Sequence, residues 1–142
     1  MTQTPFSPVL HTQSDVEDAW RRLMHPLGWP DRRLWLMLVG DDGRPSRQLT
    51  EVTDLPDLIP PEEAAGVVAM WGHLLDQVAP GGRLAVLVCR PGRGGPSPQD
   101  LGSAAALYSA GRAGGVALEV IHLATDEDVH PIPYDAVGRA GA

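Results

Sequence analysis

The spacing of apolar residues predicts a helix near the N-terminus, after a polar stretch that we interpret as a flexible arm over residues 1–13. Four apolar residues of this helix recur at i, i+4, i+7 and i+8 and form one stripe: Val16, Trp20, Leu23 and Met24. Ser14 is in the position of an N-cap, with acidic residues in the turn that follows it. Because Pro26 disfavours helical geometry in the residue before it, the helix is expected to end near His25.

Two further helices are predicted at 62–78 and 98–113, and each ends at a glycine-containing turn, at 80–82 and 114–115. The apolar residues of the first of these cover more than half of its circumference: Val67, Val68, Met70, Trp71, Leu74, Leu75 and Val78. They cannot all face one sheet, so we expect a homodimer through this helix. The alternative is that the N-terminal helix covers the surplus within one chain.

Strand patterns occur at four places: 34–39, 48–52, 83–89 and 116–123. The first two flank a turn at 40–43 and are expected to form a hairpin. The order helix, hairpin, helix, strand, helix, strand predicts an α/β sandwich built on a mixed sheet with flanking helices. We therefore expect one domain over residues 14–134, irregular in its last part, and a C-terminal tail over 135–142.

Composition limits the classes of function. With 142 residues, 43% hydrophobic and 20% charged, the chain resembles an ordinary globular domain. The formal net charge of -7 disfavours a nucleic-acid partner, because such binding depends on neutralising phosphates. Cys89 is the only cysteine, which indicates a reducing compartment, and no leader or membrane-spanning apolar run is apparent. We expect a cytoplasmic protein without a membrane partner.

The most informative segment is the apolar strand 83–89, followed by a Pro/Gly-rich loop and by Ser97-x-x-Asp100 at a helix start. In order and loop chemistry this segment resembles the metal-binding segment of the JAMM/MPN metallopeptidases, most closely that of the RadC-like proteins. The resemblance covers residues 14–124 in element order and implies a JAMM/MPN, cytidine-deaminase-like architecture. Aligned on Pro91, it places Val88 and Arg90 where that family has its two zinc-binding histidines.

The resemblance therefore implies a degenerate site, whose positions are Val88, Cys89, Arg90, Ser97 and Asp100. Valine has no donor atom and arginine is a permanent cation, so we expect no metal, no cofactor and no catalytic residue there. Ser97 and Asp100 are explained by a capping box with Pro98 at the first helical position. The prediction is a catalytically inactive domain that binds an unknown protein partner or a small ligand.

Two further interpretations of the same segment stay open. A thiol beside Arg90 and near a helix start can have a lowered pKa, although no histidine lies near Cys89 in sequence to act as its base. Arg90 and Arg93, in a glycine-rich loop before a helix, are candidates for binding an anion. Either would make the protein an enzyme of a non-metal type that uses the same cleft.

Outside this segment, His122 and His130 flank the acidic run 126–128, which raises the question of a metal site. The spacing matches no regular ligand pattern, and an acidic surface turn is the simpler interpretation. Trp29, between Gly28 and Pro30, is either an exposed interface anchor or packs over the hairpin.

Overall fold

The computed structural model describes residues 9–140, apart from the side chains at 47–48 and 138–140. In chain order its elements are α1 (Gln13–Leu23), β1 (Arg33–Val39), β2 (Pro45–Val52), α2 (Pro61–Val78), β3 (Arg83–Cys89), α3 (Pro98–Gly114), β4 (Ile121–Ala124), β5 (Val129–Ile132) and α4 (Tyr134–Ala140). The predicted bounds of β3 are confirmed, and those of α2 and α3 differ by one residue at one end.

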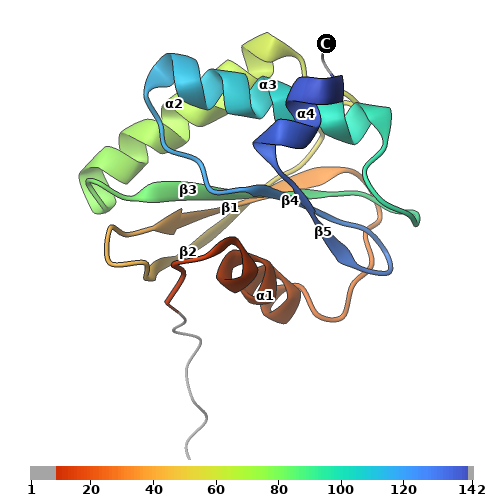
Figure 1. The fold of residues 1–142 in the computed structure, drawn as a ribbon, viewed down its shortest axis with the longest axis horizontal. Coiled ribbons are helices and arrows are strands. Elements are labelled where there is room, and N and C mark those ends of the chain that lie inside the picture. The colour runs from red at the N-terminus through yellow and green to blue at the C-terminus, as the bar shows by residue number, and fades with distance from the viewer. Residues whose placement is uncertain (1–8, 141–142) are drawn as a thin grey trace, which may run out of the picture.

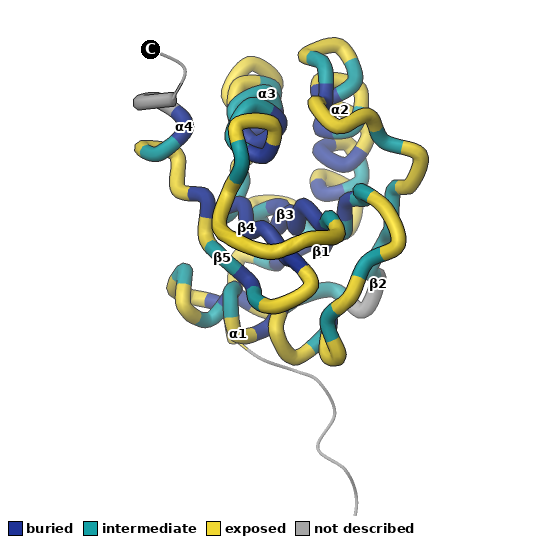
Figure 2. The backbone as a smooth tube through the Cα atoms, turned by 90° about the vertical axis from the view of Figure 1, so that its right-hand side faces the viewer, coloured by how far each residue is buried: buried dark blue, intermediate teal, exposed yellow. Residues whose placement is uncertain are grey.

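The described strands form a mixed sheet in the order β2-β1-β3-β4-β5. β1 is antiparallel to both of its neighbours, β3 and β4 are parallel, and β5 returns antiparallel to β4. α1 covers one face of the sheet, and α2, α3 and α4 cover the other (Figure 1). Viewed along the layers, α2 and α3 stand side by side above the sheet with α1 beneath it (Figure 2). The predicted α/β fold with a mixed sheet and flanking helices is confirmed.

β3 is the central strand, and both of its faces are buried. Val86 and Val88 point into the core cluster under α2 and α3, whereas Leu87 and Cys89 point into the cluster under α1. This alternation follows from the two-residue period of a strand. Among the described residues, no helix is long and apolar enough to cross a membrane.

The N-terminal segment is ordered earlier than expected. Thr12, and not Ser14, caps α1, because the hydroxyl of Thr12 accepts from the Asp15 amide at 3.1 Å and the Asp15 carboxylate accepts from the Thr12 amide at 3.1 Å. Leu10 is fully buried, and its amide donates to the Gly43 carbonyl at 2.6 Å. The burial of Leu10 fixes the chain two residues before the cap. Residues 1–8 of the predicted arm lie outside the described part of the chain.

The C-terminal segment also has more structure than its sequence indicates. β4 begins at Ile121, five residues later than predicted, and the expected irregular tail contains β5 and α4. The hydroxyl of Tyr108 ties β4 and β5 to α3, since it accepts from the Ile121 amide at 2.8 Å and donates to the Ile132 carbonyl at 2.7 Å. A four-residue strand that contains Pro131 has no clear pattern of its own, and prolines are tolerated in strands at the edge of a sheet.

The apolar surplus of α2 is smaller than predicted. Val68, Trp71 and Leu75 are buried in the core, and two more of the seven residues, Val67 and Leu74, pack partly against it. α1 is not the cover, because it lies on the opposite face of the sheet (Figure 1). The cover is α3, together with Val52, Leu55 and Ile59 from the segment before α2. Met70 and Val78 stay exposed.

Candidate functional site

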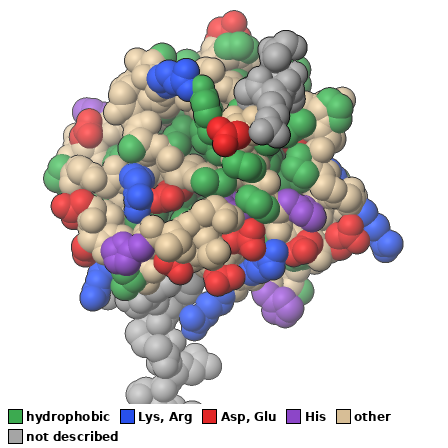
Figure 3. Space-filling view, viewed as in Figure 1, with side chains coloured by type: hydrophobic (Ala, Val, Ile, Leu, Met, Phe, Trp, Pro, Cys, Tyr) green, Lys and Arg blue, Asp and Glu red, His purple; other side chains and the backbone are tan. Residues whose placement is uncertain are grey.

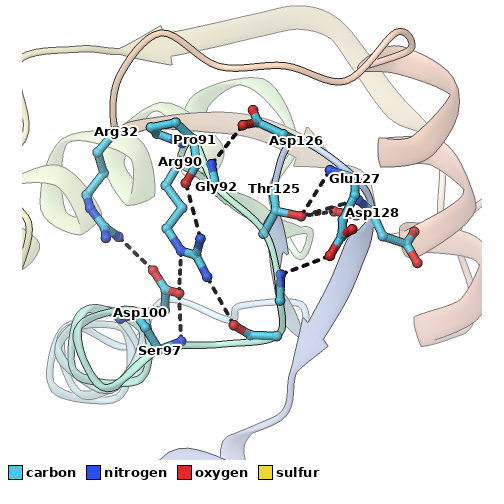
Figure 4. Close-up of polar contacts among 12 residues, drawn as sticks. Arg32, Arg90, Pro91, Gly92, Ser97, Asp100, Thr125, Asp126, Glu127 and Asp128 are labelled. Atoms are coloured by element: carbon cyan, nitrogen blue, oxygen red, sulfur yellow. Dashed lines mark hydrogen bonds and ion pairs between the residues drawn. The ribbon is translucent and has the colours of Figure 1, made fainter.

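The candidate site lies where β3 ends and α3 begins, at the end of the sheet where β3 runs into the glycine-rich loop (Figure 4). Val88 precedes this end and is fully buried between its strand neighbours, Leu34 on β1 and Leu123 on β4. Its side chain belongs to the apolar core and offers no ligand atom. Arg90, two residues on, turns its guanidinium toward the first turn of α3.

Every nitrogen of the Arg90 guanidinium is used within the chain. Nε donates to Oδ2 of Asp100 at 2.7 Å, Nη1 to the carbonyl of Pro91 at 3.2 Å and Nη2 to the carbonyl of Gly95 at 3.0 Å. The side chain is 13% exposed. Arg90 therefore closes the loop over the end of β3, and three of its five N–H groups are committed to partners within the chain.

Asp100 is the charged centre of this arrangement, and its side chain is fully buried. Oδ2 also accepts from the Ser97 amide at 2.8 Å, and Oδ1 accepts from Nη1 of Arg32 at 2.8 Å. Burial opposes ionisation, but the hydrogen bonds from one backbone amide and two guanidinium groups outweigh it. The pKa of Asp100 therefore lies below its usual value, and the carboxylate is ionised.

The predicted capping box is confirmed. The Ser97 hydroxyl accepts from the Asp100 amide at 3.2 Å while the Asp100 carboxylate accepts from the Ser97 amide, and Pro98 is the first residue of α3. Arg32 was missed from sequence, because nothing near it points to Asp100. Arg32 reaches this carboxylate because it directly precedes β1, and the start of β1 lies beside the end of β3, with Arg33 paired to Cys89.

The glycine-rich loop is held by the turn between β4 and β5. The Gly92 amide donates to Oδ2 of Asp126 at 2.8 Å, and the Gly94 amide donates to Oε1 of Glu127 at 2.9 Å. The hydrogen bond from the Gly92 amide, and after it the one from the Trp29 amide, lower the pKa of Asp126. Two carboxylates of the chain thus occupy the amides that a phosphate would use. Arg93 is exposed and lies near Asp126, so its charge is also partly balanced.

Cys89 is separated from this loop by the sheet. Its side chain is fully buried in the cluster under α1, on the opposite face from Val88. Burial raises the pKa of the thiol, and the guanidinium that acts against this effect is that of Arg33, not Arg90. The thiol is therefore protonated and shielded, which is the state of a packed cysteine.

The histidines near the acidic turn do not gather around it. His122 is fully buried; its Nδ1 lies 3.0 Å from the Val120 carbonyl and its Nε2 lies 3.0 Å from Nε2 of Gln13. Burial lowers the pKa of His122. Within residues 9–140, no three His, Cys, Asp or Glu side chains are grouped so that they could hold a metal ion.

The remaining sequence candidates belong to local structure. Trp29 is partly buried against the core under α1, and its amide donates to Asp126 at 3.1 Å, so packing explains it without a partner. On β2, Glu51 accepts from Arg33 at 2.8 Å.

Two hollows lie elsewhere, along the seam between α2 and α3. Their volumes are about 760 and about 680 Å³. Both are lined by Ala65, Ala110 and Ala113, so they form one continuous depression, which we call the α2–α3 groove. Neither hollow is lined by a residue of the β3–α3 loop. The open space on this face is therefore separate from the candidate site at the β3–α3 loop.

Comparison with known proteins identifies no family. No protein-family model matches the chain, and no curated protein sequence is significantly similar to it. The resemblance to the RadC-like proteins thus stays a hypothesis that depends on the strand, the loop and the residues Ser97 and Asp100.

Proposed function

We propose that this protein is a catalytically inactive RadC-like domain that works as a binding module for a protein or a small ligand. The observation that carries the proposal is the ion pair between Arg90 and Asp100. According to the resemblance, Asp100 stands at the position of the carboxylate that binds zinc in the RadC-like proteins. Here a guanidinium of the same chain supplies the positive charge that a metal would supply to it.

The donor set does not fit zinc. A catalytic zinc site needs three protein ligands with unprotonated donor atoms. Val88 has none, Arg90 is a cation, and both oxygens of Asp100 already accept charged hydrogen bonds. We derive no reaction step through a metal at this position.

The element order supports the RadC-like part of the proposal. Helix, hairpin, helix, strand, helix and strand follow one another as the resemblance implies, and the Ser97-x-x-Asp100 pair opens α3 directly after the loop. The single free, buried cysteine accords with the proposed cytoplasmic location. The net charge of -7 accords with a partner other than nucleic acid.

The alternative, an enzyme that uses Cys89 or the pair Arg90 and Arg93, has less support. Burial holds the thiol protonated on the far face of the sheet. Arg90 is committed to Asp100 and to the loop carbonyls. Such an enzyme would have to open the loop before either group could meet a substrate.

Elemental analysis of the purified protein tests the inactive site. We expect well below one zinc per chain after purification in zinc-containing buffer. One tightly held zinc per chain would overturn the proposal.

A pair of variants tests the RadC-like part. Val88→His/Arg90→His places two imidazoles at i and i+2 and frees Oδ2 of Asp100 from a guanidinium, while Oδ1 stays paired with Arg32, so it should bind one zinc per chain. Arg90→His alone is the matched control and should not bind zinc tightly. A folded double variant that binds no zinc would show that the loop does not have JAMM geometry.

A further inference from the structure

The part of α3 that lines the α2–α3 groove carries no charged side chain. Its lining positions, all exposed or partly buried, are small: Gly102, Ala105, Ala106, Ser109, Ala110 and Ala113. The charged residues of α3 are Asp100, which is buried, and Arg112, whose guanidinium lies 4.7 Å from the centre of the Tyr134 ring. A surface helix ordinarily carries charged residues on its solvent face, so this face has the composition of a packed one. Figure 3 shows that charged side chains are dense over the lower half of this view of the molecule and fewer over its upper half, where the helices lie.

Glycines set the depth and the ends of the α2–α3 groove. A Cβ at Gly72 would lie 2.4 Å from Cγ2 of Val116, and a Cβ at Gly102 would lie 2.6 Å from Cδ1 of Leu58. Val116 and Leu58 therefore rest directly on helix backbone and give the groove an apolar wall at each end. From Gly102 to Ala113 the groove follows α3 for about 16 Å, or three turns.

The charged groups at the edge of the groove are acidic. Asp76 lines one hollow, Glu62 adjoins Pro61, which lines the other, and Asp57 precedes Leu58 at the same end. α2 contains no arginine or lysine. Since Arg112 is engaged by Tyr134, the described rim offers negative charge to whatever lies in the groove.

We propose that the α2–α3 groove binds an amphipathic helix of a partner protein, with an aliphatic face toward the alanines and basic residues on its flanks. Small residues allow the backbone of a third helix to approach α2 and α3 closely. The acidic rim complements lysine or arginine on the helix flanks. This inference deepens the proposed function by naming the class of partner, and it rests on that function.

Other occupants fit the same surface less well. An extended peptide would find no edge to pair with, because the backbone groups of α2 and α3 are bonded within the helices. A small molecule would find few polar groups to orient it, since Ser109, His73 and Asp76 are the polar side chains of the lining. A second copy placed groove to groove would bring two acidic rims together.

The test uses two synthetic helical peptides of about 14 residues, which span about four turns. Both carry the same leucine and alanine face; one has lysine flanks and the other has glutamate flanks. Binding of each to the full chain is measured by fluorescence anisotropy at about 0.15 M salt. The lysine peptide should bind saturably, and the glutamate peptide at least about tenfold more weakly.

Two pairs of variants locate the binding. Ala69→Gln/Ala106→Gln places two long uncharged side chains in the groove and should weaken the lysine peptide about tenfold, because it buries amides without partners. The matched control, Met70→Gln, lies on the exposed side of α2 and should leave binding unchanged. Glutamine is a good helix former, and circular dichroism confirms that each variant is folded.

Glu62→Gln/Asp76→Asn tests the rim and should weaken the lysine peptide about threefold. Its control, Asp18→Asn/Asp41→Asn, removes the same charge from exposed sites on α1 and the hairpin turn and should have no effect. If the groove variant bound the lysine peptide as tightly as the native protein does, the binding would reflect general attraction to the net charge of -7. That result would overturn the inference.

Equal binding of both peptides, or self-association that the groove variant abolishes, would also overturn the inference. The inference would also be overturned if an apolar dye bound in the groove and neither peptide did. In a zinc-free protein these results reject the basic helix and leave the proposed binding module standing. One zinc per chain would reject the proposed function itself.

Discussion

Nε of Arg90 lies 2.7 Å from Oδ2 of Asp100, and the Asp100 side chain is fully buried while that of Arg90 is 13% exposed. This pair joins the end of β3 to the first turn of α3. Arg32 donates to the other oxygen of the same carboxylate, so one buried negative charge is shared by two cations. A buried charge that loses a partner is costly, because neither water nor another group replaces it.

Arg90→Met should destabilise the protein by about 3 kcal/mol, because it keeps the length of the side chain but removes one of the two cations from Asp100. Urea denaturation measures the change. Arg93→Met is the matched control: Arg93 is exposed in the same loop, and its loss should change stability by less than about 0.5 kcal/mol. Equal stability of the two variants would mean that the ion pair does not hold the loop.

Ser97→Ala should cost about 1 kcal/mol of unfolding free energy, since the hydroxyl caps the Asp100 amide at the start of α3. The loss should appear as a lower denaturation midpoint for the whole domain, because α3 packs on the sheet and on α2. Ser109→Ala, on the outward face of the same helix, should have little effect. An unchanged midpoint for Ser97→Ala would reopen a functional role for that hydroxyl.

Native Cys89 should react with a thiol reagent far more slowly than the urea-unfolded chain, because burial hides the thiol and raises its pKa. Gly95→Cys, placed in the exposed loop of a Cys89→Ala chain, supplies the reference rate for an accessible thiol. Labelling of Cys89 as fast as that reference would favour the enzyme alternative.

His122 should make the protein less stable as the pH falls below the usual histidine pKa of 6.5. Burial lowers its pKa in the folded state, so in this range the unfolded chain binds the proton more readily. The stabilisation from neutral His122 is thus present above pH 6.5 and is lost on acidification toward the folded pKa. Denaturation midpoints between about pH 7.5 and about pH 5.5 measure the loss.

His122→Gln should flatten this pH dependence, whereas His73→Gln, at an exposed position on α2, should leave it as in the native protein. If both variants keep the native slope, another group causes it.

Of the seven apolar residues of α2 on which the predicted homodimer rests, two stay largely exposed: Met70 at 64% and Val78 at 53%. Sedimentation at micromolar concentration should give about twice the 15.2 kDa chain mass. Met70→Glu should return the single-chain mass, because it places a charge on the exposed apolar side chains through which we expect the two copies to meet. A native species of 15.2 kDa would show that α3 and the segment before α2 cover the helix sufficiently.

Several parts of the fold could be predicted from sequence because their signals are local. The six buried residues that follow Arg83 define β3, and the Ser97–Asp100 capping box lies within one helical turn. Thr12–Asp15 is an equally local signal, but it competes with Ser14, and the burial of Leu10 decides between them. β5 and α4 are too short to show a period and are stabilised by Tyr108 and by the sheet edge.

The chemistry of the candidate site was decided by the tertiary structure. Arg32 reaches Asp100 across 68 residues, and Asp126 reaches Gly92 across 34, because β1 and β4 both pair with β3. Sequence alone determined that no zinc ligand stands at Val88 or Arg90. Only the pairing of distant strands decided that a guanidinium closes the loop and that carboxylates occupy its amides. Residue identity limits the atoms present, whereas distances between distant segments depend on how the whole sheet assembles.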